Sequence, residues 1–364
     1  MRAAVLNEQP GKLEVEDLIV DNPAPNEVLI RVVGAGLCHS DLHFMEASYP
    51  TPVPCVAGHE SAGVVEAVGR DVTYCRPGDH VVSCLSVFCG QCRLCLSGRP
   101  YLCLNKDAAL RPAGAPPRLR KQDGTPVSQL IRLGGFAEMM LVHQNAVVVI
   151  DREMPLDRAA LVGCGVLTGT GAVFRTARVE PGSRVCVIGA GGVGLAAIQG
   201  ARIAGAGQIV VVDLSDTKLE VAKQFGATDV VNASTVENAV KAVKSLTGGG
   251  VDYSFEAIGL KATAEQSFQV LDVGGIATVI GMIPPTAMVE VRGVDLFNFE
   301  KKIQGSMMGS NQFRTDIPAL IRMYMDGRLK LDEMVSARLG LDDVNDGYAA
   351  MKRGEVSRQV IVFD

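Results

Sequence analysis

The sequence predicts an α/β protein that combines a β-rich part with a doubly wound parallel sheet. Residues 1–105 contain short apolar runs separated by Pro and Gly turns, a pattern that is typical of strands. From about residue 165, apolar runs of strand length alternate with helical stretches, which predicts parallel β-α-β units. The 364 residues are enough for two such parts, and we expect the first part to resume after about residue 308.

Short apolar runs indicate the elements of the β-rich part. Val28–Val33 and Ala62–Val68 predict strands. Residues 106–128 are polar and contain several Pro and Arg residues, so we expect a long surface loop there. After residue 308, Ile317–Met325 predicts a helix and Gln359–Val362 predicts a closing strand.

The second part is predicted as a regular alternation of strands and helices. The expected strands are Val185–Ile188, Ile209–Val212, Val230–Val231, Val251–Glu256 and Ile276–Ile280, and the expected helices are Thr217–Phe225, Val236–Leu246 and Ala262–Val270. Strands connected in this way lie side by side in one parallel sheet.

Charge and cysteine content argue against several classes of protein. With 35 basic and 40 acidic residues the net charge is −5, whereas nucleic-acid binding needs a basic face. No apolar run reaches about 18 residues, so we expect no membrane-spanning helix. The first residues do not resemble a secretory signal, and we expect a cytoplasmic protein. Ten cysteines in such a chain are better explained as metal ligands and buried thiols than as disulfides.

A glycine motif after the first strand of the second part predicts a dinucleotide site. In Gly189-Ala-Gly191-Gly-Val-Gly194, the glycines allow a sharp turn, close approach of a pyrophosphate and tight helix packing. The phosphates would lie at the helix N-terminus. Asp213 ends the next strand, where a carboxylate binds a ribose 2′-hydroxyl and repels a 2′-phosphate, which favours NAD over NADP. The alternative is an ordinary Gly-rich turn with a capping Asp.

Four closely spaced cysteines predict a structural zinc site. Cys89, Cys92, Cys95 and Cys103 lie within one 15-residue segment. Four thiolates at such spacing suit a closed tetrahedral zinc site, and two-residue spacings do not favour disulfide pairing. The alternative is four buried or oxidised cysteines.

A second, dispersed set of residues predicts a catalytic zinc. Cys38, His59 and Cys164 each lie in a distinctive setting, in Cys38-His-Ser-Asp41, Gly58-His-Glu60 and Gly163-Cys-Gly165. Three protein ligands and one open position are the pattern of a catalytic zinc site. Taken alone, a single His before a Glu is more often a surface or hydrogen-bonded residue than a ligand.

These motifs together resemble one family, the zinc-dependent medium-chain alcohol dehydrogenases, over essentially the whole chain. The resemblance rests on Gly58-His-Glu-x2-Gly63-x5-Gly69-x2-Val72, Gly78-Asp-His-Val81, the four-cysteine segment, Gly163-Cys-Gly165 and the glycine motif, all in the family's order. It implies a GroES-like catalytic domain over residues 1–165 with the structural zinc loop at 89–103. It also implies a Rossmann NAD-binding domain over 166–308 and a return to the catalytic domain over 309–364.

The resemblance implies roles around a catalytic zinc bound by Cys38, His59 and Cys164. Asp41 is then the carboxylate that orients the zinc-bound imidazole, and Glu60 a carboxylate near the metal. Ser40 takes the position beside the substrate oxygen, and His43 the solvent end of a proton relay. Simpler readings stay open, because Ser40 and Asp41 could cap a helix and His43 could be a surface residue.

The resemblance also implies coenzyme contacts outside the main glycines. Thr168 and Val193 press the nicotinamide toward the substrate, Gly192 belongs to the glycine turn, Lys218 contacts the adenosine ribose and Arg358 the pyrophosphate. His39 stands where many members carry an arginine on the pyrophosphate, so coenzyme binding is expected to be weaker and more pH-sensitive. Lys218 could instead be an ordinary charge on a helix face. Cys55, Cys75, Cys84 and Cys186 fit no metal spacing and are interpreted as buried apolar residues.

The implied activity is reversible hydride transfer between an alcohol and NAD, with two zinc ions per chain, one catalytic and one structural. Tyr49 and Leu85 would line the substrate pocket and favour a medium-chain or aromatic, primary or secondary alcohol. The branch that oxidises S-(hydroxymethyl)glutathione has an acidic residue at position 49 and an arginine at position 107, where this chain has Tyr49 and Asp107. A thiol-dependent formaldehyde dehydrogenase is therefore the less favoured enzymatic alternative.

Two further alternatives concern other classes of protein. A non-catalytic NAD-binding sensor and a zinc-free quinone-reductase relative are both disfavoured, because all three zinc ligands, Asp41 and Glu60 are present. As partners we expect small-molecule alcohols and aldehydes, with neither nucleic acid nor membrane. The long loop after the four cysteines resembles the dimeric branch of the family, which implies a homodimer, with a homotetramer as the alternative.

Overall fold

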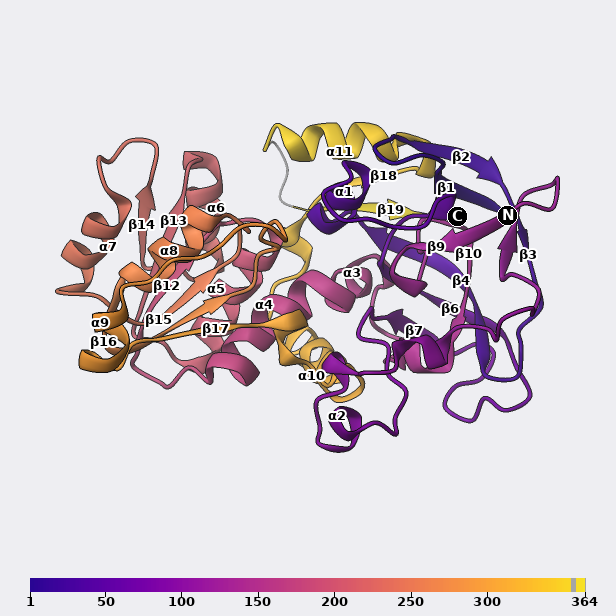
Figure 1. Ribbon diagram of the computed structural model, residues 1–364, viewed down its shortest axis with the longest axis horizontal. Helices are drawn as coiled ribbons and strands as arrows, with labels where there is room; N and C mark the ends of the chain where they lie inside the picture. The colour runs from indigo at the N-terminus through magenta and orange to yellow at the C-terminus, as the bar shows by residue number, and fades with distance from the viewer. Residues whose placement is uncertain (355–357, 364) are drawn as a thin grey trace. The chain divides into compact units, whose positions relative to one another are not determined.

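The computed structural model describes residues 1–354 and 358–363 and divides the chain into two compact units (Figure 1). One unit comprises Met1–Cys164 and Gln312–Asp364, and the other comprises Gly165–Asn311. The second unit is therefore an insertion in the sequence of the first. The sequence analysis drew the corresponding boundaries after residues 165 and 308.

The unit of residues 165–311 is built on a six-stranded parallel sheet with strand order β14-β13-β12-β15-β16-β17. The strands are β12 (Arg184–Ile188), β13 (Gln208–Asp213), β14 (Asp229–Asn232), β15 (Val251–Glu256), β16 (Leu271–Val279) and β17 (Lys302–Gly305). Counted along the chain, this is the order 3-2-1-4-5-6 of dinucleotide-binding folds. The predicted doubly wound parallel sheet is confirmed.

Helices connect the strands of this sheet. They are α5 (Gly192–Ala204), α6 (Asp216–Phe225), α7 (Ala239–Thr247), α8 (Lys261–Gln269) and α9 (Gly293–Asn298), whereas α4 (Leu167–Gly171) precedes the first strand. Buried Val, Ile and Leu side chains of the strands pack with Val243 of α7 and Phe268 of α8 in one apolar core. The strand order reverses between β12 and β15, so a ligand crevice is expected at the carboxyl ends of these two strands.

The other unit contains two sheets. A six-stranded sheet has the order β2-β1-β5-β9-β8-β3, and a seven-stranded sheet has the order β11-β7-β6-β4-β19-β18 with β10 paired to β4. The strands are β1 (Arg2–Leu6), β2 (Leu13–Asp17), β3 (Ile19–Val20), β4 (Glu27–Gly36), β5 (Cys55–Val56), β6 (Glu60–Val68), β7 (His80–Ser83), β8 (Leu119–Arg120), β9 (Pro126–Gln129), β10 (Met139–His143), β11 (Val147–Val149), β18 (Val335–Leu339) and β19 (Arg358–Val362). The β-rich character predicted for residues 1–105 is confirmed.

Short helices complete this unit. They are α1 (His39–Met45), α2 (Arg93–Leu96), α3 (Leu156–Leu161), α10 (Phe313–Met325) and α11 (Val344–Lys352). Short 3₁₀ turns occur at Pro100–Leu102, Lys106–Ala109, Leu130–Arg132, Gln144–Ala146, Asp332–Met334 and Leu341–Asp343, and at Met307–Ser310 in the other unit. Strand β19 pairs with β4, so the end of the chain is hydrogen-bonded to the strand that leads into α1.

Some predicted element boundaries differ from the structure. The helix expected from Val236 begins at Ala239, because the Asn238 side chain accepts a hydrogen bond from the Lys241 N–H at 2.9 Å and caps it there. The loop expected over residues 106–128 is only partly exposed. Arg118 is buried and pairs with Glu27 at 2.6 Å, and β8 and β9 form a strand pair within or next to this segment.

One continuous helical segment, Leu156–Ala177, includes π-helical turns at Val162–Val166 and Ala172–Ala177. By length and composition alone it is apolar enough to cross a membrane, although the sequence analysis expected no such helix. However, 83% of its most apolar window is buried inside the protein, which is typical of a core helix.

Candidate active site

Four buried side chains with metal-binding atoms converge within the unit of residues 1–164 and 312–364. They are Cys38, His59, Glu60 and Cys164, and one donor atom of each lies within 4.8 Å of all the others. His59 Nε2 is buried and has no hydrogen-bond partner among the described residues. Two thiols and an imidazole around one point form a donor set that zinc prefers. The residues therefore fit a zinc ion, and they include all three ligands that the sequence predicts.

Pairing of two strands brings distant parts of the sequence to this point. Strands β4 and β6 are antiparallel with Gly36 opposite Glu60. Cys38 follows the end of β4, and His59 directly precedes β6, so the pairing brings both to the same end of the sheet. A Cβ at Gly36 would meet the Glu60 carboxylate, so only glycine fits this register without displacing it.

A second close approach positions Cys164, which lies in the π-helical turn after α3. A Cβ added to the neighbouring Gly163 would lie 2.5 Å from the Ser83 carbonyl oxygen at the end of β7. The helix can therefore approach β7 this closely only because residue 163 is glycine. This explains why a glycine precedes the cysteine.

The Asp41 carboxylate fixes the orientation of His59. Asp41 Oδ1 lies 2.9 Å from His59 Nδ1 and accepts a hydrogen bond from the Gly58 N–H at 3.2 Å. The Asp41 and His59 side chains have no exposed surface. An imidazole whose Nδ1 is held by a carboxylate presents Nε2 to a metal, which agrees with the role that the sequence analysis gave Asp41.

Arg358 forms a buried ion pair with Glu60, next to the metal-binding cluster. The guanidinium is only 5% exposed, whereas the sequence analysis assigned it to the coenzyme pyrophosphate. A buried cation needs a counter-charge, and Glu60 supplies it here. Within the described unit, the contact of Arg358 is thus with Glu60, the carboxylate expected near the metal.

The charges in the cluster shift the pKa values of its members. Burial lowers the pKa of His59, but the Asp41 carboxylate and the Cys38 thiolate outweigh it and raise that pKa to about 10. A hydrogen bond with Cys164 lowers the pKa of Cys38 and raises that of Cys164. Without a metal the cluster therefore retains protons, which metal binding would release.

Helix α1 carries the residues expected around the substrate oxygen. The N-cap position of α1 is occupied by Cys38, whose backbone is extended. No side chain of the described residues makes a capping hydrogen bond at this end of the helix, so the capping alternative for Ser40 and Asp41 is wrong. The Ser40 hydroxyl lies 3.6 Å from the Cys38 sulfur. His43 follows on the same helix, half-buried, with its ring centroid 6.2 Å from that of Tyr49.

Two other residues predicted near this site differ in exposure. Leu85, expected in the substrate pocket, is buried with 9% of its surface exposed. His39 is the first residue of α1 and is exposed.

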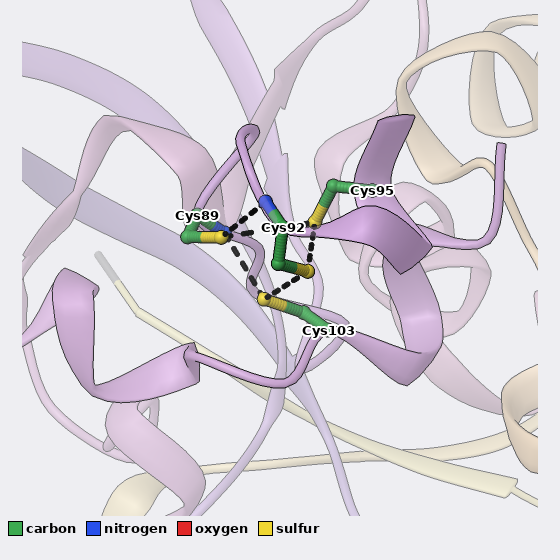
Figure 2. Close-up of side chains that lie close together, drawn as sticks. All are labelled: Cys89, Cys92, Cys95 and Cys103. Carbon is green, nitrogen blue, oxygen red and sulfur yellow. Dashed lines mark hydrogen bonds between the residues drawn. The ribbon is translucent and has the colours of Figure 1, made fainter. Parts of the chain in front are cut away.

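The four cysteines of the second cluster also converge (Figure 2). The sulfur–sulfur distances are 3.5 Å for Cys92–Cys95, 3.9 Å for Cys92–Cys103 and 4.0 Å for Cys89–Cys95. A tetrahedron with zinc–sulfur bonds of about 2.3 Å has edges of about 3.8 Å. The site therefore fits the predicted structural zinc.

Backbone N–H groups point at these sulfurs. The Cys89 N–H lies 3.2 Å from the Cys103 sulfur, and the Cys92 N–H lies 3.4 Å from the Cys89 sulfur. Hydrogen bonds from backbone N–H groups, that of Cys95 above all, lower the pKa of Cys92 to about 6. Burial and a hydrogen bond with Cys92 raise the pKa of Cys95 to about 12. The backbone N–H groups thus favour the thiolate, the form that binds metals, at Cys92 but not at Cys95.

The glycine motif adopts the geometry expected of a dinucleotide turn. Gly189 has φ +101° and a Cβ at Gly194 would collide with its carbonyl oxygen, so both positions require glycine. A Cβ at Gly191 would meet nothing within 4 Å, so the turn is open there, at the N-terminus of α5. Gly192 is the first residue of that helix. An open turn with free N–H groups fits a pyrophosphate.

Asp213, at the end of β13, is engaged in this turn. Its carboxylate accepts hydrogen bonds from the N–H groups of Ala190 at 2.8 Å, Leu214 at 2.8 Å and Ser215 at 3.1 Å. A carboxylate offers about four acceptor positions, so one remains for a ribose hydroxyl. Lys218 lies half-buried in the first turn of the following helix, α6.

Thr168 and Val193, predicted beside the nicotinamide, come from neighbouring helices of this unit. A Cβ at Gly169 would collide with the Val193 carbonyl oxygen, so α4 and α5 approach closely at this point. The Thr168 hydroxyl lies 3.4 Å from the sulfur of Met308. The sequence analysis missed Met308, because it stands in a turn with no motif and its φ is +52°.

Comparisons with known proteins agree with this geometry. Residues 24–152 match the alcohol dehydrogenase GroES-like domain family, and residues 192–324 match the zinc-binding dehydrogenase family. The chain is 36% identical to an S-(hydroxymethyl)glutathione dehydrogenase of Paracoccus denitrificans over 100% of this chain and 99% of that protein. It is 39% identical to a putative alcohol dehydrogenase D of Mycobacterium tuberculosis over 99% of both chains.

A solved structure is similar over the same length. The crystal structure of benzyl alcohol dehydrogenase from Acinetobacter calcoaceticus matches with a TM-score of 0.92 and 32% identity, over 100% of this chain and 99% of that one. Two family matches, full-length relatives and two zinc-binding clusters agree. The chain therefore belongs to the zinc-dependent medium-chain alcohol dehydrogenase family, and it is an oxidoreductase that acts on small-molecule alcohols.

Proposed function

We propose that the protein reversibly oxidises a primary or secondary alcohol, medium-chain or aromatic, to an aldehyde or ketone with NAD. The observation that carries this proposal is the free Nε2 of His59, buried beside the sulfurs of Cys38 and Cys164. These three residues would hold the catalytic zinc, and Cys89, Cys92, Cys95 and Cys103 the structural zinc. When bound, zinc supplies a Lewis acid for the alcohol oxygen and NAD supplies a hydride acceptor.

The residues of α1 would handle the proton of the alcohol. Ser40, close to the Cys38 sulfur, would accept the proton of the substrate hydroxyl and at the same time release its own hydroxyl proton into the relay that ends at His43. His43 is three residues later, on the same helix face, and passes the proton toward solvent. Asp41 holds His59 in the tautomer that leaves Nε2 free for the metal.

The unit of residues 166–308 would bind NAD, with the rest of the chain forming the catalytic domain. Gly189, Gly191, Gly192 and Gly194 would form the phosphate turn. Lys218 would contact the ribose, His39 and Arg358 the pyrophosphate, and Thr168 and Val193 the nicotinamide. The remaining acceptor position of Asp213 favours NAD, because a 2′-phosphate there would face a carboxylate.

The proposed substrate class depends on the residues expected around the pocket. Tyr49 and Leu85 offer an aromatic and an aliphatic side chain, which suit an apolar alcohol. The similar benzyl alcohol dehydrogenase supports an aromatic substrate. Asp107 is exposed and paired with Arg132 at 2.5 Å, so its charge is partly balanced. Because this ion pair partly offsets the negative charge of Asp107, S-(hydroxymethyl)glutathione stays the second candidate substrate.

We also propose a cytoplasmic homodimer. All ten cysteines lie in the described part of the chain and none forms a disulfide, which suits a reducing compartment. Strand β17 is the last strand of the parallel sheet, and the exposed side chains of Met288 and Phe297 lie in the segment before it. Pairing of two such edges would join two chains, with a homotetramer as the alternative.

The test is the absorbance of reduced nicotinamide when zinc-loaded protein is mixed with NAD and a panel of alcohols. The panel includes short, medium-chain, aromatic and secondary alcohols, and formaldehyde with and without glutathione. We expect reduction with medium-chain or aromatic alcohols. Cys38→Ala should abolish it, whereas Cys186→Ala, which removes a buried thiol outside both clusters, should not.

Other outcomes decide against the proposal. Reduction only with formaldehyde plus glutathione would favour the thiol-dependent dehydrogenase. No reduction with any alcohol by protein that contains two zinc ions and binds NAD would favour the non-catalytic sensor. Reduction with NADP in preference to NAD would contradict the role of Asp213.

A further inference from the structure

The hydroxyl of Tyr348 is buried behind the metal-binding cluster. Tyr348 lies on α11 and is 2% exposed. Its oxygen and Asp41 Oδ2 are both buried, and neither has a hydrogen-bond partner among the described residues. A buried polar atom without a partner costs about 1–3 kcal/mol, so two such atoms in one region call for an explanation.

The fold holds the Tyr348 ring in one place. A Cβ at the preceding Gly347 would lie 2.6 Å from a Leu37 methyl group, so α11 packs directly against the residue before Cys38. The Gly347 carbonyl accepts a hydrogen bond from Gln359 Nε2 at 2.7 Å. On its other side the ring packs on Phe136, with centroids 6.4 Å apart.

The packing around the ring brings Tyr348 close to Asp41. Phe136, on which the ring packs, lies against Gly58, since a Cβ at Gly58 would collide with Phe136 Cδ1. The Gly58 N–H in turn donates a hydrogen bond to Asp41 Oδ1. A phenol is protonated at neutral pH and has one hydrogen to donate. The Asp41 carboxylate can only accept, and its Oδ1 already faces His59 Nδ1 and the Gly58 N–H.

We propose that the Tyr348 hydroxyl donates a hydrogen bond to Asp41 Oδ2 and thereby positions the carboxylate that orients His59. Tyr348 is then a positioning residue of the metal site, which acts through Asp41 and touches neither metal nor substrate. The proposal rests on the proposed function only in assigning a metal to Cys38, His59 and Cys164. It would extend the chain of contacts behind the metal from two residues to three, His59–Asp41–Tyr348.

The consequence of losing this hydroxyl follows from the geometry. Without a partner, Oδ2 would be a buried carboxylate oxygen with no donor, and the carboxylate would rotate to find one. Such a rotation would move Oδ1 away from His59 Nδ1 and leave the imidazole less well oriented. Loss of a group that orients a metal-bound histidine costs about 10–100-fold in metal affinity.

The experiment compares Tyr348→Phe with Tyr324→Phe in the full-length, zinc-loaded protein. Tyr324, on α10, also places its hydroxyl near a carboxylate, that of Asp332 at 3.1 Å, but outside the metal cluster. Zinc release to a coloured chelator is followed without substrate. The protein is expected to release its two zinc ions in two kinetic phases. The phase that is absent from Cys38→Ala is assigned to the zinc of the catalytic cluster. We expect Tyr348→Phe to release this zinc about tenfold faster, and Tyr324→Phe to behave as wild type.

A double-mutant cycle tests whether Tyr348 acts through Asp41. In an Asp41→Asn background, Tyr348→Phe should cause little further acceleration of zinc release, because the carboxylate is already absent. Unfolding midpoints of the metal-free proteins should be similar, which separates positioning from a loss of packing. Equal zinc release by Tyr348→Phe and wild type would overturn the proposal, and so would additive effects in the cycle. If wild type and Cys38→Ala released zinc in the same way, no zinc would be bound at Cys38, and this result would instead overturn the proposed function.

Discussion

His39 is the residue at which this chain departs from the arginine that many members of its family carry. It is exposed at the start of α1, directly after the ligand Cys38. A guanidinium is charged at every pH of interest and binds phosphate with two parallel hydrogen bonds, whereas a neutral imidazole offers one donor. If His39 contacts the coenzyme pyrophosphate, its charge is available only when the imidazole is protonated.

His39→Arg should therefore tighten NAD binding. A charge-assisted hydrogen bond gained at every pH predicts about a tenfold lower dissociation constant at pH 8, and a smaller dependence on pH between about 6 and 8. Isothermal titration calorimetry of the protein with NAD across this pH range measures both effects. Wild-type affinity that does not change with pH, together with an unchanged affinity of the variant, would contradict a pyrophosphate contact at this position.

Single residues also define what the sequence could and could not predict about the site. The zinc ligands are identified by neighbouring glycines that the fold requires. A Cβ at Gly163 would collide with the Ser83 carbonyl oxygen, and a Cβ at Gly36 would displace the Glu60 carboxylate. Arg358 and Tyr348 have no such local signal. The ion pair of Arg358 with Glu60 and the proposed hydrogen bond of Tyr348 with Asp41 each join residues about 300 positions apart. They depend on the β19–β4 pairing and on the packing of α11.

Among the elements, the site depends most on strand β4, which leads to Cys38. The first residue of β4, Glu27, forms ion pairs with the segment that follows the four cysteines. Glu27 is 3% exposed and pairs with Arg111 at 2.7 Å and with Arg118 at 2.6 Å. Burial acts to raise the pKa of Glu27, but hydrogen bonds from Arg111, Ala24 and Arg118 outweigh it and lower that pKa. Composition alone predicted an exposed loop here, because these charge pairs cross more than 80 positions of sequence.

Glu27→Gln should loosen this junction in a pH-dependent way. Leaving the buried Arg118 guanidinium without a carboxylate, while the half-buried Arg111 keeps Asp21, predicts a loss of about 3 kcal/mol in the local free energy of opening at neutral pH. Because the pKa of Glu27 is lowered in the folded state, its stabilisation is present above about pH 4.5 and is lost as the pH falls through the folded-state pKa. The difference between wild type and variant should therefore shrink in acid.

Hydrogen exchange of β4 and of residues 106–120 measures this local free energy. Glu66→Gln is the matched control, since Glu66 on neighbouring β6 is 43% exposed and pairs with Arg31 at 2.9 Å. An exposed pair of this kind contributes about 0–1 kcal/mol. A difference between Glu27→Gln and wild type that stays constant from neutral to acid pH would contradict the assignment.

For the molecule as a whole, the predictions are most reliable in the part with alternating strands and helices. Five of the six strands of the parallel sheet are predicted because each contains a short apolar run, and Val251–Glu256 coincides with β15. Strand β17 was missed, since Lys302–Gly305 is polar and only half-buried. A strand of this kind belongs at the edge of a sheet, and the same edge is where the proposed homodimer would form.

Substitution of the exposed apolar side chains next to that edge tests the dimer. Phe297 on α9 is 78% exposed and Met288 is 75% exposed, and both lie in the segment that precedes β17. Phe297→Asp and Met288→Asp should each lower the dimer fraction, because a carboxylate desolvated at an apolar interface is costly. Leu246→Asp, on α7 beside the opposite end of the sheet, should leave the dimer intact. Sedimentation equilibrium measures the mass of each variant. A dimer weakened by Leu246→Asp alone would move the interface to the β14 edge, and a wild-type mass of four chains would replace the dimer by the tetramer.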